Sequence, residues 1–199
     1  MAFVGAGCAD SDGTTLREPG TGGATPPPVV VVTEPESLFT DLDVSFSLRS
    51  PAFRPNENIP FHYSRDGANV SPPLEWINQP IDAVELALVV TDPSADGFVH
   101  WVIWGLDPTT GGLAEGDVPP GALQALNGFG DLGWVGPDPP DLDSPHAYLF
   151  RLFALRDLPS DVTPGGGGRA SIELLEAHAM AIAELIGFFP VAELSTQTY

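Results

Sequence analysis

The segment 86–106, LALVVTDPSADGFVHWVIWGL, restricts the fold more than any other part of the chain. Two runs of β-branched, aliphatic and aromatic residues stand on either side of a short turn that contains Pro and Gly. Runs of this length and composition, bounded by such residues, are typical of buried β-strands. We therefore expect two strands of the protein's core in this segment.

Two polar residues interrupt this apolar segment. Asp92 ends the first run, and His100 lies within the second. A carboxylate and an imidazole brought to one end of a sheet lose solvation unless they pair with each other or bind a ligand. They form either a hydrogen-bonded structural cluster or the floor of a site, and these residues alone leave both interpretations open.

Composition and hydrophobic pattern favour a mainly β fold. The 199 residues suffice for one sizeable core, and the 22 Gly and 22 Pro favour a β architecture rich in loops. Alternation or continuous apolar runs predict strands at 44–48, 59–63, 84–91, 98–106 and 146–155. In the last of these, Tyr148 falls on the same face as His146. We expect a sandwich or distorted barrel.

One helix is predicted, late in the chain. Residues 171–186 place aliphatic side chains at helical spacing, with Ser171 as the N-cap. His178 falls within that apolar face, which predicts a core histidine with one hydrogen-bond partner. A single late helix after several strands predicts a peripheral helix packed on a β core.

The charge of the chain disfavours several classes of partner. The formal net charge is −20, and all seven basic residues are Arg. Nucleic-acid binding and attachment to anionic lipids both need clustered basic residues, so we expect neither. The single cysteine, Cys8, rules out an intrachain disulfide, and no apolar run of 18 residues occurs. We expect no cofactor.

The first residues resemble the end of a bacterial lipoprotein signal. The small residues Gly5, Ala6 and Gly7 precede Cys8, the candidate lipidation site. Because only seven residues precede the cysteine, we expect the true start upstream of Met1. Residues 1–37 are predicted to be a disordered tether, 38–190 the folded domain and 191–199 a tail. This predicts an extracytoplasmic lipoprotein of the cell envelope; a cytoplasmic protein with a disordered N-terminus is the alternative.

Several motifs together resemble one family. In chain order they are Ile59-Pro60, DGANVSPPLEW at 66–76, Asp92-Pro93, VHW at 99–101, NGFG at 127–130, GWVGP at 133–137 and PHAY at 145–148. This series, which covers about residues 40–190, resembles phosphatidylethanolamine-binding proteins. The resemblance is strongest to their bacterial Raf-kinase-inhibitor-like branch.

The resemblance implies a Greek-key β-sandwich with a C-terminal peripheral helix and a pocket for anions such as phosphate or phosphoethanolamine. It also implies a protein that acts by binding, without a shared catalytic reaction. The pocket residues of the family correspond to Asp92, Pro93, His100, Gly136, His146 and Tyr148.

The chain departs from the family pattern at two places. Ser94 and Asp96 replace the second Asp and second Pro of the turn after Asp92. Ala147 stands where the family has Arg, which removes a fixed positive charge beside the pocket. These departures bear on phosphate binding more than on the fold.

Other functions stay open at this point. Asp92, His100 and His146 could serve a metal-assisted or acid–base enzyme, although no HxH or HExxH motif supports a metal site. A protease- or kinase-inhibitor role through surface loops is a further alternative. The expected partner is a small anionic or zwitterionic ligand, and the sequence is also compatible with a protein partner, a lipid anchor and a homodimer.

Overall fold

The computed structural model describes residues 45–140 and 144–189. The predicted tether with its lipidation candidate Cys8, and the predicted tail at 191–199, lie outside the described residues. No helix among the described residues is long and apolar enough to cross a membrane.

Two antiparallel sheets form the fold. The larger has the order β6 (Leu123–Gln124), β4 (Phe98–Leu106), β3 (Glu85–Asp92), β7 (His146–Leu155) and β8 (Ala179–Phe189). The smaller has the order β1 (Ser47–Arg49), β2 (Leu74–Ile77) and β5 (Gly112–Leu113). The helices are the 3-10 turns η1 (Phe61–Tyr63) and η2 (Pro93–Ala95) and the α-helix α1 (Gly168–His178).

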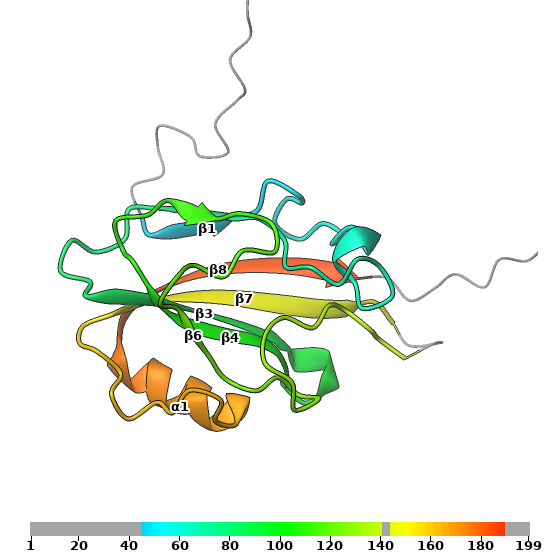
Figure 1. Ribbon diagram of the computed structural model, residues 1–199. Helices are drawn as coiled ribbons and strands as arrows, with labels where there is room; N and C mark the ends of the chain where they lie inside the picture. Colours follow the sequence, from blue (N-terminus) through cyan, green and yellow to red (C-terminus); the bar gives the residue numbers. More distant parts are fainter. Residues whose placement is uncertain (1–44, 141–143, 190–199) are drawn as a thin grey trace, which may run out of the picture. The chain divides into compact units, whose positions relative to one another are not determined.

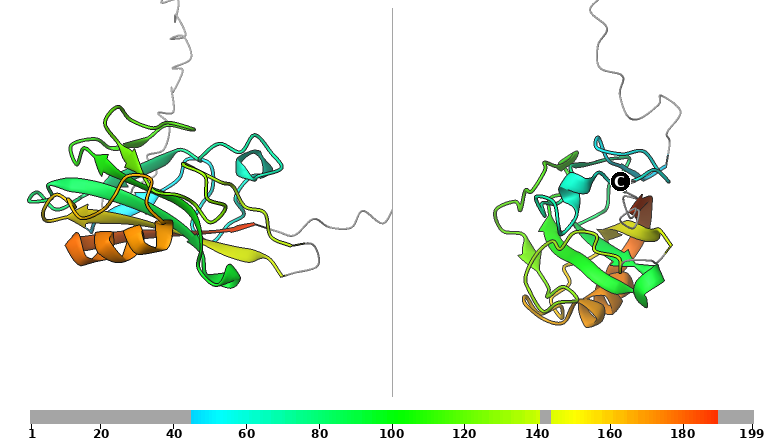
Figure 2. Two further views of the ribbon diagram at one scale, coloured as in Figure 1. Left: turned by 60° about the horizontal axis from the view of Figure 1, so that its bottom comes forward. Right: turned by 90° about the vertical axis from the view of Figure 1, so that its right-hand side faces the viewer.

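The large sheet is covered on both faces. The small sheet lies over one face and α1 over the other, and the end-on view shows the same three layers (Figures 1 and 2). On β3, Leu88 and Val90 pack between the sheets, whereas Ala87 and Val89 face the core beside α1. A strand buried on both faces needs apolar residues throughout, which explains the unbroken apolar run. The predicted mainly β fold, with two packed antiparallel sheets and a helix near the C-terminus, is confirmed.

The predicted strands at 98–106 and 146–155 coincide with β4 and β7. The prediction of a strand at 59–63 is wrong, because the chain forms η1 there. Pro60 precedes η1 and lacks an N–H, and its carbonyl accepts a hydrogen bond from Tyr63 N at 3.0 Å. Just before this stretch, Asn58 forms an isolated β-bridge with Phe188.

The predicted helix at 171–186 is correct only in its first half. It begins earlier, at Gly168, with Gly167 as the N-cap in place of Ser171, and it ends at His178. From Ala179 the chain forms β8, which pairs with β7 from Leu155↔Ala179 to His146↔Phe189. The sequence AMAIAELIGFF fits the spacing of apolar residues in a helix as well as in a strand. Pairing with the side of β7 that does not face β3 satisfies the backbone groups of β7 and therefore favours the strand.

His178 is not the core histidine predicted from the helical pattern. It lies at the end of α1, partly exposed, and both ring nitrogens contact carboxylates. Nδ1 donates to Asp157, and Nε2 lies 2.9 Å from Asp161 Oδ1. The helix turns into a strand at this point, so the side chain faces the loop after β7 rather than the core.

Candidate functional site

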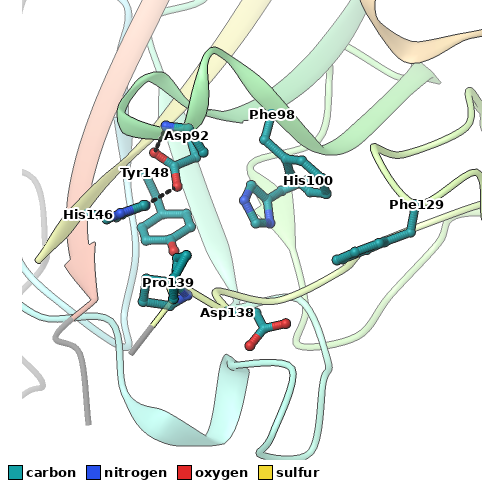
Figure 3. Close-up of a pocket in the computed structure, with 10 residues that line it drawn as sticks. Asp92, Phe98, His100, Phe129, Asp138, Pro139, His146 and Tyr148 are labelled. Atoms are coloured by element: carbon teal, nitrogen blue, oxygen red, sulfur yellow. Dashed lines mark hydrogen bonds and ion pairs between the residues drawn. The ribbon is translucent and has the colours of Figure 1, made fainter. Parts of the chain in front are cut away.

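Three strand ends meet at one edge of the large sheet. β3 ends at Asp92, which pairs with Phe98 at the start of β4, and β7 begins at His146 on the other side of β3. His100 is the extra residue of a β-bulge in β4, because Val90 pairs with Trp101 and Thr91 with Val99, and its ring centroid lies 5.0 Å from that of Phe98. The antiparallel topology therefore places an acid and two imidazoles around one point (Figure 3).

The Asp92 carboxylate is fixed by several hydrogen bonds. It caps η2, where its Oδ1 accepts from Ser94 N at 2.8 Å and Ala95 N at 3.2 Å. Its Oδ2 lies 2.6 Å from His146 Nδ1, and both side chains are buried. Because an ionised carboxylate only accepts, Nδ1 of His146 carries the hydrogen. Asp92 thus sets the orientation of the His146 ring.

His100 is held by the protein backbone. Its Nδ1 donates to the carbonyl oxygen of Val135 at 2.7 Å, and the ring is almost fully buried. Burial lowers the pKa of His100, although the Val135 hydrogen bond and the charge of Asp92 act in the opposite direction. The imidazole is therefore neutral at pH 7, and its Nε2 is then a hydrogen-bond acceptor.

A cavity of about 180 Å³ opens beside these groups. The residues that line it are Asp92, Ala95, Phe98, His100, Phe129, Asp138, Pro139, Pro140, His146 and Tyr148. The His100 ring makes an edge-on contact with Tyr148, with 5.0 Å between ring centroids, and burial raises the pKa of Tyr148. The cavity has mostly apolar and aromatic walls with a few polar groups, as binding sites for small molecules do.

The structure brings together four of the six site residues predicted from sequence. Asp92, His100, His146 and Tyr148 all line the cavity, whereas Pro93 and Gly136 do not. Pro93 is the first residue of η2, where its missing N–H costs nothing.

Gly136 serves close packing. A Cβ atom at this position would lie 2.2 Å from the carbonyl oxygen of Tyr63, and its own N–H donates to Asn69 Oδ1 at 2.8 Å. The glycine thus lets two loop segments lie against each other near the cavity.

Sequence reasoning missed six residues of the cavity wall, which are Ala95, Phe98, Phe129, Asp138, Pro139 and Pro140. Phe98 could have been found, since it lies two residues before His100, the spacing that predicts one face of a strand. Phe129 and Asp138 lie on loops, and no local pattern indicates that they meet. Arg65 connects them: its Nη1 donates to Asp138 Oδ2 at 2.6 Å, and its Cζ lies 4.2 Å from the Phe129 ring centroid.

The described residues do not group as a metal centre. Among them, no three His, Cys, Asp or Glu side chains are placed to hold one ion. Asp92 and His146 hydrogen-bond each other, and His100 uses Nδ1 for the backbone. This geometry gives the metal-assisted alternative no support from the described residues.

Comparison with known proteins decides the family. The family model described as phosphatidylethanolamine-binding protein matches residues 49–190. The chain belongs to the phosphatidylethanolamine-binding protein family. Membership of this family supports a binding-type protein rather than an enzyme.

Relatives from distant organisms share this family. The UPF0098 protein of Methanothermobacter thermautotrophicus is 41% identical over 150 residues, which cover 72% of this chain and 97% of the relative. A lipoprotein candidate of Mycobacterium tuberculosis, LppC, is 39% identical over 145 residues, which cover 72% of this chain and 71% of the relative.

Solved structures of phosphatidylethanolamine-binding protein relatives show the same fold. CT736 of Chlamydia trachomatis, described as a homologue of these proteins, aligns with a TM-score of 0.67 and 34% identity over 75% of this chain and 99% of its own. YbcL of Escherichia coli, described as a member of the mammalian family, aligns with a TM-score of 0.68 and 27% identity over 74% of this chain and 99% of its own.

Proposed function

We propose that this chain is a non-enzymatic binding protein whose cavity takes a small phosphorylated headgroup, with phosphoethanolamine or phosphate as representative ligands. The observation that carries the proposal is the buried Asp92–His146 pair beside His100 at one wall of the cavity. Asp92 orients one imidazole and Val135 orients the other, so both rings have fixed positions before a ligand arrives. Such preorganisation lowers the entropic cost of binding.

His100 couples binding to a proton. In its neutral form its Nε2 accepts a hydrogen bond, so a phosphoryl oxygen must bring a proton or His100 must take one up. The second pKa of a phosphomonoester is about 6, close to that of an ordinary imidazole. One proton shared between the ligand and His100 therefore strengthens binding as the pH falls.

Isothermal titration at pH 6 with phosphoethanolamine and with inorganic phosphate tests this proposal. We expect His100→Gln to bind both ligands at least about tenfold more weakly, the effect of losing one charge-assisted hydrogen bond. His62→Gln is the matched control, because His62 is half-exposed and pairs with Glu115 outside the cavity. Equal affinity in wild type and His100→Gln, or no heat of binding in wild type, would contradict the proposal.

For the N-terminus, we propose lipidation of Cys8 and an extracytoplasmic location. The small residues before Cys8 support it, as does the relative LppC, which is named as a lipoprotein candidate. Mass spectrometry of the N-terminal peptide from the native host tests it: a lipid-modified Cys8 is expected, and an unmodified thiol contradicts it. A protein partner and a homodimer remain predictions.

A further inference from the structure

We propose that Asn69 is a positioning residue of the cavity, which acts on His100 through a single peptide group. The inference rests on the proposed function, in which the Nε2 atom of His100 meets the phosphoryl group. It adds a residue that lies outside the cavity wall, in the segment DGANVSPPLEW at 66–76, and it gives that segment a part in binding.

The peptide group that joins Val135 to Gly136 lies between the two side chains. Its carbonyl oxygen accepts from His100 Nδ1 at 2.7 Å, and its N–H donates to Asn69 Oδ1 at 2.8 Å. A trans peptide group is planar, and its N–H and C=O point in opposite directions. Asn69 therefore holds one side of a rigid unit whose other side orients the His100 ring.

The bond to Asn69 also makes the Val135 carbonyl a stronger acceptor. Hydrogen bonds in a chain polarise one another, so donation by the N–H of a peptide group makes its oxygen more negative. A more negative oxygen keeps the proton of His100 on Nδ1 and leaves the Nε2 lone pair for the ligand. The same oxygen stabilises the imidazolium that forms when the ring takes up a proton from the ligand.

The conformation and the chemistry of Asn69 suit this role. Its φ is +52°, in the left-handed region that Asn adopts more readily than most residues, and its N–H donates to the Ser64 carbonyl at 3.2 Å. The turn presents the side-chain oxygen to Gly136. An amide oxygen accepts a hydrogen bond without charge, whereas a carboxylate would add a negative charge near a site for anions.

Other hydrogen bonds hold the segment 134–137 in place. At one end of the segment, Trp134 Nε1 donates to the Tyr63 carbonyl at 3.3 Å. At the other end, the Pro137 carbonyl accepts from Arg65 N at 3.0 Å. Neither bond involves the asparagine side chain, so its removal should disturb the polarisation and exact direction of the carbonyl more than the fold.

The alternative is that Asn69 only closes its own loop. A residue of that kind changes the Tm when its side chain is removed, and it leaves the Nδ1 proton and the pKa of His100 as they were. A positioning residue changes both properties of His100. The titratable groups whose charges act on His100 are Asp92, Asp138 and His146, and all three are kept in the variants that separate the two accounts.

The experiment is NMR of the full chain without ligand, followed by calorimetric titration with inorganic phosphate at pH 6. Asn69→Gly removes the acceptor, keeps a backbone that tolerates positive φ, and changes no charge. We expect it to move the His100 Hδ1 resonance upfield and to lower the pKa of His100 below its wild-type value. Phosphate binding should weaken about threefold, the effect of one weakened neutral hydrogen bond.

Asn69→Asp is the conservative variant, because it keeps an oxygen acceptor at the same place. It should hold the His100 Hδ1 resonance at or downfield of its wild-type position and raise the pKa of His100. Asn56→Gly and Asn56→Asp are the matched controls, since Asn56 also has a left-handed backbone, with φ of +64°, and does not line the cavity. Both controls should leave His100 and the phosphate affinity unchanged.

Three results would overturn this role of Asn69. They are an unchanged His100 resonance and pKa in Asn69→Gly, an Asn69→Asp variant that behaves like Asn69→Gly, and equal weakening of phosphate binding by Asn69→Gly and Asn56→Gly. Failure of wild type to bind phosphate would instead overturn the proposed function. The resonance and the pKa are measured without ligand, so they still decide whether Asn69 acts on His100.

Discussion

Asp92 and His146 are 54 positions apart in the sequence, yet their buried carboxylate and imidazole lie 2.6 Å apart where β3 ends and β7 begins. The contact ties the end of β3 to the start of β7. It also links η2 to the cavity, because the same carboxylate accepts from two backbone N–H groups of that turn. One side chain therefore supports both the fold and the site.

Replacing Asp92 with Ala should destabilise the protein by about 3 kcal/mol, since it leaves a buried imidazole and two backbone N–H groups without their acceptor. Urea denaturation at pH 7 measures this loss. Asp107→Ala is the control: Asp107 accepts from Thr109 in an exposed turn, and its removal should matter far less. A fully stable Asp92→Ala variant would contradict the role given to the pair.

Gly136→Ala should destabilise the protein by about 2 kcal/mol or more, because the new methyl group would overlap the Tyr63 carbonyl. Thermal unfolding is the measurement. Gly111→Ala provides the comparison, because no atom lies within 4 Å of the place where its Cβ would be. Similar losses at the two positions would show that close packing at Gly136 is unimportant.

Acidification should weaken the fold through His100. Burial lowers the pKa of His100 in the folded state, so the unfolded chain binds the proton more strongly. The contribution is fully present above about pH 6.5, the ordinary value, and is lost as the pH falls below it. The free energy of unfolding of wild type should therefore fall more steeply from pH 7 to pH 5 than that of His100→Gln. Parallel curves would argue against a neutral buried ring.

His178, unlike His100, should stabilise the fold more as the pH falls. Its hydrogen bonds to Asp157 and then to Asp161 raise the pKa of His178, so its contribution is present below about pH 6.5. That contribution is lost as the pH rises through the raised pKa. His178→Gln should lower Tm by a few degrees at pH 6 and leave it nearly unchanged at pH 9. The same difference at both pH values would mean that the imidazolium charge plays no part.

The strands that carry the site were predictable because their local signals agree. The runs around Val89, Val102 and Phe150 are apolar, rich in β-formers and bounded by turn residues, and the structure makes each a strand. The segment after His178 was not predictable in this way. Its small and aliphatic residues fit a helix or a strand, and only the pairing partner β7, which lies far away in sequence, decides between them.

The residues of the site also differ in whether local sequence or distant contacts determine their position. Asp92 and His100 stand out as polar residues in or beside apolar strands, and the family resemblance added His146 and Tyr148 to the expected pocket. Asp138 and Phe129 reach the cavity on loops, and their arrangement depends on a contact with Arg65 from a third loop. Such contacts have no period or spacing in the sequence.

The protonation state of His100 during ligand binding tests the central claim most directly. Nitrogen NMR of the imidazole rings, at pH 7, distinguishes a bare Nε2 from a protonated one. We predict that His100 starts with a bare Nε2 and becomes protonated as phosphoethanolamine is added, while exposed His62 stays unchanged. A His100 signal that does not respond to saturating phosphoethanolamine would contradict the account of this cavity as a phosphoryl-binding site.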